Sequence, residues 1–141
     1  MYKNGTLAFD SKISADCRHV GSVTKGRKTN KYLCAGCGSV EDLIAVLDWV
    51  SDGGILQKRK EFGLDRECDV SALLISKKGS VFHIDSRVYP YLVDASFHAC
   101  GSGSDLAIGA MAMGASAVEA VRVASKFDGY TGGSIRTLTW K

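Results

Sequence analysis

The stretch that decides the fold runs from Ala99 to Gly133 and reads ACGSGSDLAIGAMAMGASAVEAVRVASKFDGYTGG. It opens with a Gly-Ser-Gly turn that follows a short apolar run. Small side chains at Ala107, Ala110 and Ala112 then predict a helix against which another layer can approach closely. Gly114 is typical of the end of such a helix.

A second helix follows directly. Ser116 and Glu119 form the S-x-x-E pattern of a capping box, in which each side chain satisfies a backbone N–H group at the start of a helix. We expect this helix to end near Asp128. Thr131 and the two glycines after it predict a turn into a last strand over residues 135–140.

The rest of the chain alternates between groups of strands and groups of helices. Apolar residues at helical spacing predict a helix over residues 40–50, with Ser39 as its cap and Asp42 at its third position. A more charged helix is expected over 55–62, ended by Gly63, and a loop over 88–94 around Pro90. We expect strands over residues 6–9, 20–28, 31–35, 70–76, 80–85 and 97–100, and extended or irregular chain over 13–18. This order predicts the α+β class.

Composition predicts one globular domain covering residues 1–141. The net charge is +3, which is too small to argue for nucleic acid as a partner. No apolar run approaches the ~18 residues needed to span a membrane. The start of the sequence lacks the apolar segment of a signal peptide, and the five cysteines are odd in number and irregularly spaced. We therefore expect a cytoplasmic protein with free thiols.

The Ala99–Gly133 stretch resembles the proteasome β-subunit family and its bacterial proteasome-like relatives, the N-terminal-nucleophile threonine peptidases. Four family features follow in the same order. They are the G-S-G turn at Gly101, the small-residue helix, the S-A-x-E-A-V helix from Ser116 and the D-x-Y-T-G-G turn from Asp128. This resemblance implies a four-layer αββα sandwich, with two antiparallel sheets between outer pairs of helices.

The first half of the chain is similar to the same family. The segment GTLAFDSK from Gly5 resembles the family's G-x-[IVL]-[IVL]-A-A-D-[ST]-R strand end, and TKGRK from Thr24 resembles its T-K-V-x-K segment. The segment AGCGS from Ala35 resembles the family's A-G-x-A-G turn. The resemblance therefore covers residues 3–140.

Members of this family cleave peptide bonds with the hydroxyl of an N-terminal threonine, whose own α-amine acts as the base. A lysine beside the threonine lowers the pKa of that amine, and an aspartate orients the lysine. A backbone N–H group forms the oxyanion hole. Carried over by position, the resemblance implies that Asp10 is the aspartate, Lys25 the lysine and Gly38 the glycine of the oxyanion hole. It also implies that Ser102, Asp128 and Thr131 make the hydrogen bonds around the amine. Lys28 is a rival to Lys25 if the hairpin is aligned differently.

The chain departs from the family at its start. The family's first strand begins with Thr-Thr and an apolar residue, whereas this sequence begins Met1-Tyr2. The first hydroxyl, Thr6, lies deep in the next strand. We therefore expect no peptidase turnover from the sequence as written. Three explanations stay open: about four residues are missing from its start, the nucleophile was removed, or the protein is a natural non-proteolytic relative.

The resemblance also implies partners. Family members stack into rings that enclose a chamber, so a homo-oligomer acting on peptides or unfolded proteins is expected, with an ATP-dependent unfoldase as a possible partner. The main alternative is a non-proteolytic assembly or binding protein that keeps the fold. A third hypothesis is an amidase acting on a small molecule, although the D-x-Y-T-G-G turn favours the proteasome branch.

Other motifs have simpler interpretations. The C-x-x-C of Cys34 and Cys37 lacks a second pair at zinc-ligand spacing, so we expect no metal and no cofactor. The three histidines are separated in the sequence and are expected in the core or on the surface. The basic hairpin around Lys25–Lys31 and the Lys58–Lys60 cluster are expected to be solvated faces or subunit contacts rather than a nucleic-acid surface.

Overall fold

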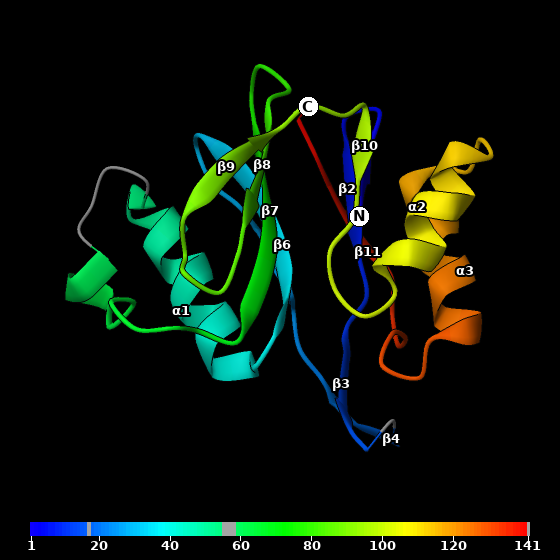
Figure 1. Ribbon diagram of the computed structural model, residues 1–141, viewed down its shortest axis with the longest axis horizontal. Coiled ribbons are helices and arrows are strands. Elements are labelled where there is room, and N and C mark those ends of the chain that lie inside the picture. Colours follow the sequence, from blue (N-terminus) through cyan, green and yellow to red (C-terminus); the bar gives the residue numbers. More distant parts are fainter. Residues whose placement is uncertain (17, 55–58, 141) are drawn as a thin grey trace.

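The computed structural model describes residues 1–16, 18–54 and 59–140. Two sheets are stacked face to face between helices, with α1 (Val40–Ser51) on one outer side and α2 (Ser104–Ala112) and α3 (Ala117–Phe127) on the other (Figure 1). The four-layer αββα arrangement that the family resemblance implies is therefore confirmed. None of the helices in the described ranges is long and apolar enough to cross a membrane.

The larger sheet has the order β5-β6-β7-β8-β9, and all its neighbouring strands are antiparallel. One of its faces packs on α1 through buried side chains that include Leu43, Leu47 and Leu74. The strands are β5 (Gly26–Lys28), β6 (Tyr32–Gly38), β7 (Val70–Ser76), β8 (Val81–Ile84) and β9 (Pro90–Val93).

The smaller sheet has the order β10-β1-β2-β11. Its strands are β1 (Tyr2–Lys3), β2 (Thr6–Phe9), β10 (Phe97–His98) and β11 (Arg136–Thr139). Leu7 and Phe9 meet Leu33 and Leu73 of the larger sheet in the apolar layer between the two sheets. On the opposite face, Ala8 packs against Ala117 and Val121 of α3.

Helix ends follow the predicted capping chemistry. The Ser116–Glu119 capping box at the start of α3 is present, and the Ser39 hydroxyl accepts a hydrogen bond from the backbone N–H of Asp42 at 3.2 Å. Where the helix predicted over 55–62 can be compared, residues 59–62 are helical, but they form a short 3-10 helix, η2 (Arg59–Phe62), rather than an α-helix. Residues 55–58 lie outside the described part of the chain.

Two strand predictions are corrected. The strand expected over 20–28 is two strands, β4 (Arg18–Ser22) and β5, because the chain changes partner between them: β4 pairs with β3 (Lys12–Ala15), whereas β5 pairs with β6. The loop expected over 88–94 contains β9. Pro90 is tolerated there because it is the first residue of an edge strand, where a missing N–H breaks no central ladder.

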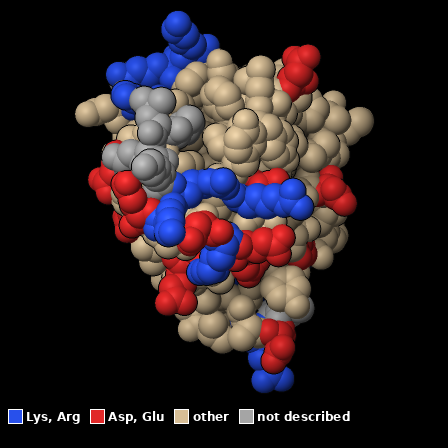
Figure 2. All heavy atoms as spheres, turned by 60° about the vertical axis from the view of Figure 1, so that its left-hand side comes forward, with Lys and Arg blue, Asp and Glu red and all other residues tan. Residues whose placement is uncertain are grey.

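The surface over α1 and η2 carries both signs of charge. Figure 2 shows Lys and Arg side chains intermingled with Asp and Glu side chains in a band across this face. Arg27 pairs with Asp48, and Arg66 pairs with Asp42 at 2.6 Å. Two of the described basic residues of this face are therefore neutralised by acidic partners.

Candidate active site

An ion pair between Lys25 and Asp10 lies at the end of β2. Both carboxylate oxygens of Asp10 accept a hydrogen bond from Lys25 Nζ at 3.0 Å. Asp10 Oδ2 also accepts the backbone N–H groups of Lys12 at 3.0 Å and Gly132 at 3.1 Å. Only 12% of the Lys25 side chain and 14% of the Asp10 side chain are exposed. The carboxylate is therefore fixed from three separate segments and in turn orients the ammonium group.

The local backbone explains why Lys25, rather than Lys28, reaches Asp10. Lys25 directly precedes β5, and its carbonyl oxygen accepts the N–H of Gly36 at 3.0 Å, which holds it against β6. Lys28 lies at the other end of β5. Its Nζ donates to the carbonyl of Thr139 and lies over the ring of Trp140, away from Asp10. The structure thus brings Lys25 to Asp10 and leaves Lys28 at the surface.

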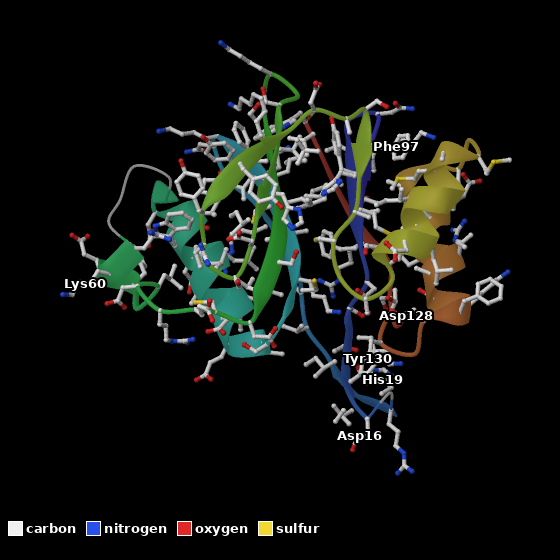
Figure 3. All side chains as sticks on the ribbon, viewed as in Figure 1. Asp16, His19, Lys60, Phe97, Asp128 and Tyr130 are labelled. Atoms are coloured by element: carbon white, nitrogen blue, oxygen red, sulfur yellow. The ribbon has the colours of Figure 1, made fainter. Side chains whose placement is uncertain are left out.

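Asp128, at the end of α3, gathers a second polar cluster. Its Oδ2 accepts the hydroxyl of Ser102 at 2.6 Å and the hydroxyl of Thr131 at 2.5 Å. Burial pushes the pKa of Asp128 upward, but the hydrogen bonds from Ser102 and Thr131 and from backbone N–H groups outweigh burial and hold the pKa below its usual range. Asp128 and Tyr130 lie beside β3 (Figure 3), where the carbonyl of Gly132 accepts the N–H of Lys12 at 3.0 Å.

Ser102 and the turn around it are shaped by close approach. The N-cap of α2 is Gly103, which has no side chain to cap the helix. The hydroxyl of the preceding residue, Ser102, donates to Asp128. A Cβ atom at Gly103 would lie 2.7 Å from Thr131 Oγ1. Glycine therefore lets the turn approach the end of α3 closely enough for Asp128 to bind both hydroxyl groups.

Gly38 ends β6 with a φ of +117°, a conformation that residues with a side chain rarely adopt. A Cβ atom at this position would lie 2.0 Å from the carbonyl oxygen of Asp69. Only glycine fits here without displacing β7. The turn in the AGCGS segment from Ala35 therefore depends on glycine at position 38.

These groups share one cavity of about 750 Å³, a size typical of ligand sites. Five of the six residues predicted from the sequence line it, and Asp128 joins it through Ser102 and Thr131. The five are Asp10, Lys25, Gly38, Ser102 and Thr131. The cavity thus brings together a cation, an anchored carboxylate, two hydroxyl groups and a backbone turn, all within reach of a single bound molecule.

The start of β1 also reaches this cavity. The amine of Met1 donates a hydrogen bond to the carbonyl of Ala8 at 2.9 Å, and the N–H of Ala8 donates to the carbonyl of Met1 at 2.8 Å. Burial lowers the pKa of this amine. An amine in this environment is held toward its neutral, basic form.

Sequence reasoning missed two thiols in the cavity wall. Cys34 and Cys37 lie three residues apart on one strand, so their side chains point to opposite faces, and the C-x-x-C pattern brings no pair together. Cys34 is buried against α1, whereas Cys37 faces the cavity beside Cys100. The period of two along β6 is a signal that could have separated Cys34 from Cys37, but nothing in the sequence pairs Cys37 with Cys100.

Two of the histidines, distant in sequence, also meet between the sheets. His83 Nδ1 and His98 Nε2 are 3.1 Å apart, and His83 Nε2 lies 2.7 Å from the hydroxyl of Ser71. Burial lowers the pKa of both imidazoles, favouring their neutral forms. Across the described residues, no group of three or more His, Cys, Asp or Glu side chains is arranged to hold a metal ion.

Comparison with solved structures places the fold. The chain superimposes on eukaryotic HslV from Trypanosoma brucei with a TM-score of 0.71 at 20% identity, covering 99% of this chain and 97% of that one. It superimposes on BPH from Thiobacillus denitrificans with a TM-score of 0.71 at 18% identity, covering 99% and 95%. The chain has the N-terminal-nucleophile hydrolase fold. A structure of BPH in complex with epoxomicin matches equally well, with a TM-score of 0.72 at 17% identity, covering 99% and 95%.

These likenesses concern the fold alone, because the identities are 20% or less. No family model matches the sequence, and no curated protein matches it.

Proposed function

We propose that the chain is a proteasome-β-like subunit whose cavity hydrolyses peptide bonds once a hydroxyl nucleophile stands on β1 ahead of Met1. The observation that carries the proposal is the register of β1. Tyr2 lies opposite Leu7 of β2 and opposite His98 of β10, so β1 is held between two antiparallel partners.

Continuing this register suggests where the proposed nucleophile would stand. The residue directly ahead of Met1 would lie between Phe9 and Cys100. The second would lie between Asp10 and Gly101, and the third between Ser11 and Ser102. The second and third positions therefore fall between the Lys25–Asp10 pair and the Ser102–Asp128 cluster, and a hydroxyl group there would have both clusters beside it.

The cavity supports the chemistry that the family resemblance implies. Lys25 supplies a positive charge that favours the neutral form of a nearby amine, and a neutral amine can take the proton from a hydroxyl nucleophile. The backbone at Gly38 would donate to the oxyanion as the carbonyl carbon becomes tetrahedral. Asp128, with Ser102 and Thr131, would bind the amine.

The direct test is hydrolysis of fluorogenic peptides by extended chains. A removable fusion would expose Thr as the first residue of a Thr-Thr-Ile segment placed ahead of Met1, with Ala-Thr-Ile as the matched control. We expect hydrolysis from the first chain and none from the second or from the chain that begins at Met1. Replacing Lys25 with Met in the Thr chain would reduce the rate by about 10²-fold or more. Equal measurable rates in the Thr and Ala chains would refute the proposed nucleophile, and no hydrolysis from either chain would refute the proposal and favour a non-proteolytic binding protein.

We further propose that copies of the chain assemble into a closed ring in the cytoplasm that receives peptides or unfolded chains, with an ATP-dependent unfoldase as the class of partner. Large apolar side chains exposed on and after α2 and α3 support a subunit interface: Met113 is 89% exposed and Phe127 74% exposed. Sedimentation should show an oligomer at micromolar concentration, shifted toward monomers by Phe127→Asp. A monomer at all concentrations would refute the assembly.

A further inference from the structure

We propose that Cys37 and Cys100 form a redox-active dithiol site in the cavity wall, which takes a low-molecular-weight disulfide such as oxidised glutathione and closes to an internal disulfide. The site joins the two sheets. Cys37 lies on β6 of the larger sheet, and Cys100 follows β10 of the smaller sheet.

The two thiols converge on one acceptor. The sulfur atoms lie 3.5 Å (Cys37) and 3.6 Å (Cys100) from the carbonyl oxygen of Ser71, and each thiol shifts the pKa of the other. A Cβ atom at Gly101 would lie 3.0 Å from the sulfur of Cys37, so the backbone beside Cys100 packs directly on the Cys37 side chain. A disulfide needs a sulfur–sulfur distance of ~2.05 Å, so closure requires the two side chains to rotate toward each other.

The pair also has the unequal acidity that thiol–disulfide exchange needs. The hydrogen bond from Cys37 lowers the pKa of Cys100 to about 7, and the same contact raises the pKa of Cys37. Cys100 is therefore the more acidic of the two thiols and the one expected to attack as a thiolate, and Cys37 is the thiol that follows. Both side chains line the cavity, which gives an oxidant access to them.

The other described thiols provide an internal contrast. Cys34 is fully buried against α1, and burial raises its pKa to about 12. The pKa of Cys68 is likewise raised by burial. Neither thiol is described in contact with a second sulfur. The reactivity is thus expected at one pair, not at the cysteines in general.

The proposed step balances. The Cys100 thiolate attacks one sulfur of the small disulfide, which forms a mixed disulfide and releases one small thiolate that takes up a proton. Cys37 then loses its proton to water, and its sulfur attacks the Cys100 sulfur and expels the second small thiol. The protein loses two hydrogens, and the small disulfide is reduced to two thiols.

Closure of this disulfide would act on the candidate active site. Cys37 is bonded to Gly38 along the chain, and Cys100 immediately precedes the Gly101–Ser102 turn, so the new bond would draw both walls of the cavity together. We expect it to block peptide binding. This effect on hydrolysis rests on the proposed function, whereas formation of the disulfide does not.

The test uses the unmodified chain in buffers of oxidised and reduced glutathione, followed by acid quenching, alkylation of free thiols and non-reducing trypsin digestion. The expected product is a cross-link between the peptide 32–58, which contains Cys37, and the peptide 88–122, which contains Cys100. Cys37→Ser and Cys100→Ser should each abolish this cross-link, and Cys34→Ala, the matched control on the same peptide, should leave it unchanged.

Two results would overturn the inference: both thiols stay free, or the cross-link joins another pair of cysteines. In the Thr-extended chain, oxidation should remove hydrolysis and dithiothreitol should restore it. Hydrolysis that is unchanged by the cross-link would refute control of the cavity by the dithiol. A cross-link that forms in a chain without hydrolysis in either redox state would count against the proposed peptidase alone.

Discussion

Replacing Asp10 with Ala should strongly destabilise the protein, because several groups depend on this one carboxylate. The substitution leaves the ammonium of Lys25, which is only 12% exposed, without its counter-charge, and it removes the acceptor of the backbone N–H groups of Lys12 and Gly132. Breaking a buried ion pair by removing one partner costs about 3–5 kcal/mol. Because this pair is slightly exposed, we expect a loss of about 3 kcal/mol in the free energy of unfolding.

Two matched variants separate the parts of this effect. Lys25→Met should cost less, about 1–2 kcal/mol, because the carboxylate of Asp10 keeps its two backbone donors. Asp48→Ala breaks the ion pair between Asp48, whose side chain is 52% exposed, and Arg27, whose side chain is 40% exposed. Because this pair is exposed, its loss should cost less than about 1 kcal/mol.

The assay is urea unfolding followed by circular dichroism. With a slope of about 1.5 kcal/mol/M, the Asp10→Ala midpoint should fall by about 2 M without a change in slope. A loss for Asp10→Ala no larger than that for Asp48→Ala would show that the Lys25–Asp10 pair is not a fixed, desolvated unit, and the reasoning about the cavity would fail with it.

Three further variants test other parts of the structure. Gly38→Ala should cost about 3 kcal/mol or more in the free energy of urea unfolding, because its Cβ would meet the carbonyl of Asp69. Gly109→Ala in α2, where a Cβ meets nothing within 4 Å, should instead stabilise the protein by about 0.5–1 kcal/mol. Equal effects of the two substitutions would contradict the requirement for glycine at position 38. The pKa of Asp128 is below its ordinary value of 3.8 in the folded chain, so its contribution to stability is present above pH 3.8 and is lost as the pH falls through the folded pKa; acid unfolding of Asp128→Asn should therefore depend less steeply on pH below about 4, and an unchanged profile would be evidence against this coupling. Ser116→Ala should lower the thermal midpoint by the equivalent of about 1 kcal/mol through loss of the capping box, and no shift would indicate that the cap is unimportant.

Local chemistry made much of the fold predictable. The Ser39 and Ser116 caps predict where α1 and α3 begin, because short polar side chains satisfy the first backbone N–H groups of a helix. The division of residues 20–28 between β4 and β5 was not predictable, because strand propensity does not say which sheet a segment joins. The N–H of Val23 donates to the carbonyl of Ser11, whereas β5, which follows, pairs with β6. Only the tertiary structure shows this change of partner.

The candidate site was likewise predictable only in part. The resemblance picked out Asp10 and Lys25, and the structure brings their side chains together; their catalytic roles stay a prediction. The Cys37–Cys100 contact was not predictable, since it joins residues 63 positions apart on different sheets. Contacts between layers depend on how two sheets are stacked, and a single sequence carries no local signal for that.

The most direct measurement is the dependence of peptide hydrolysis on the position of an N-terminal threonine. Chains would be compared whose first residue is Thr placed directly ahead of Met1, or as the second, third or fourth residue ahead of it. The register of β1 predicts hydrolysis only with Thr as the second or third residue, beside Asp10 or Ser102. Hydrolysis independent of this position, or absent from all four chains, would contradict the assignment of the cavity as a hydrolase site.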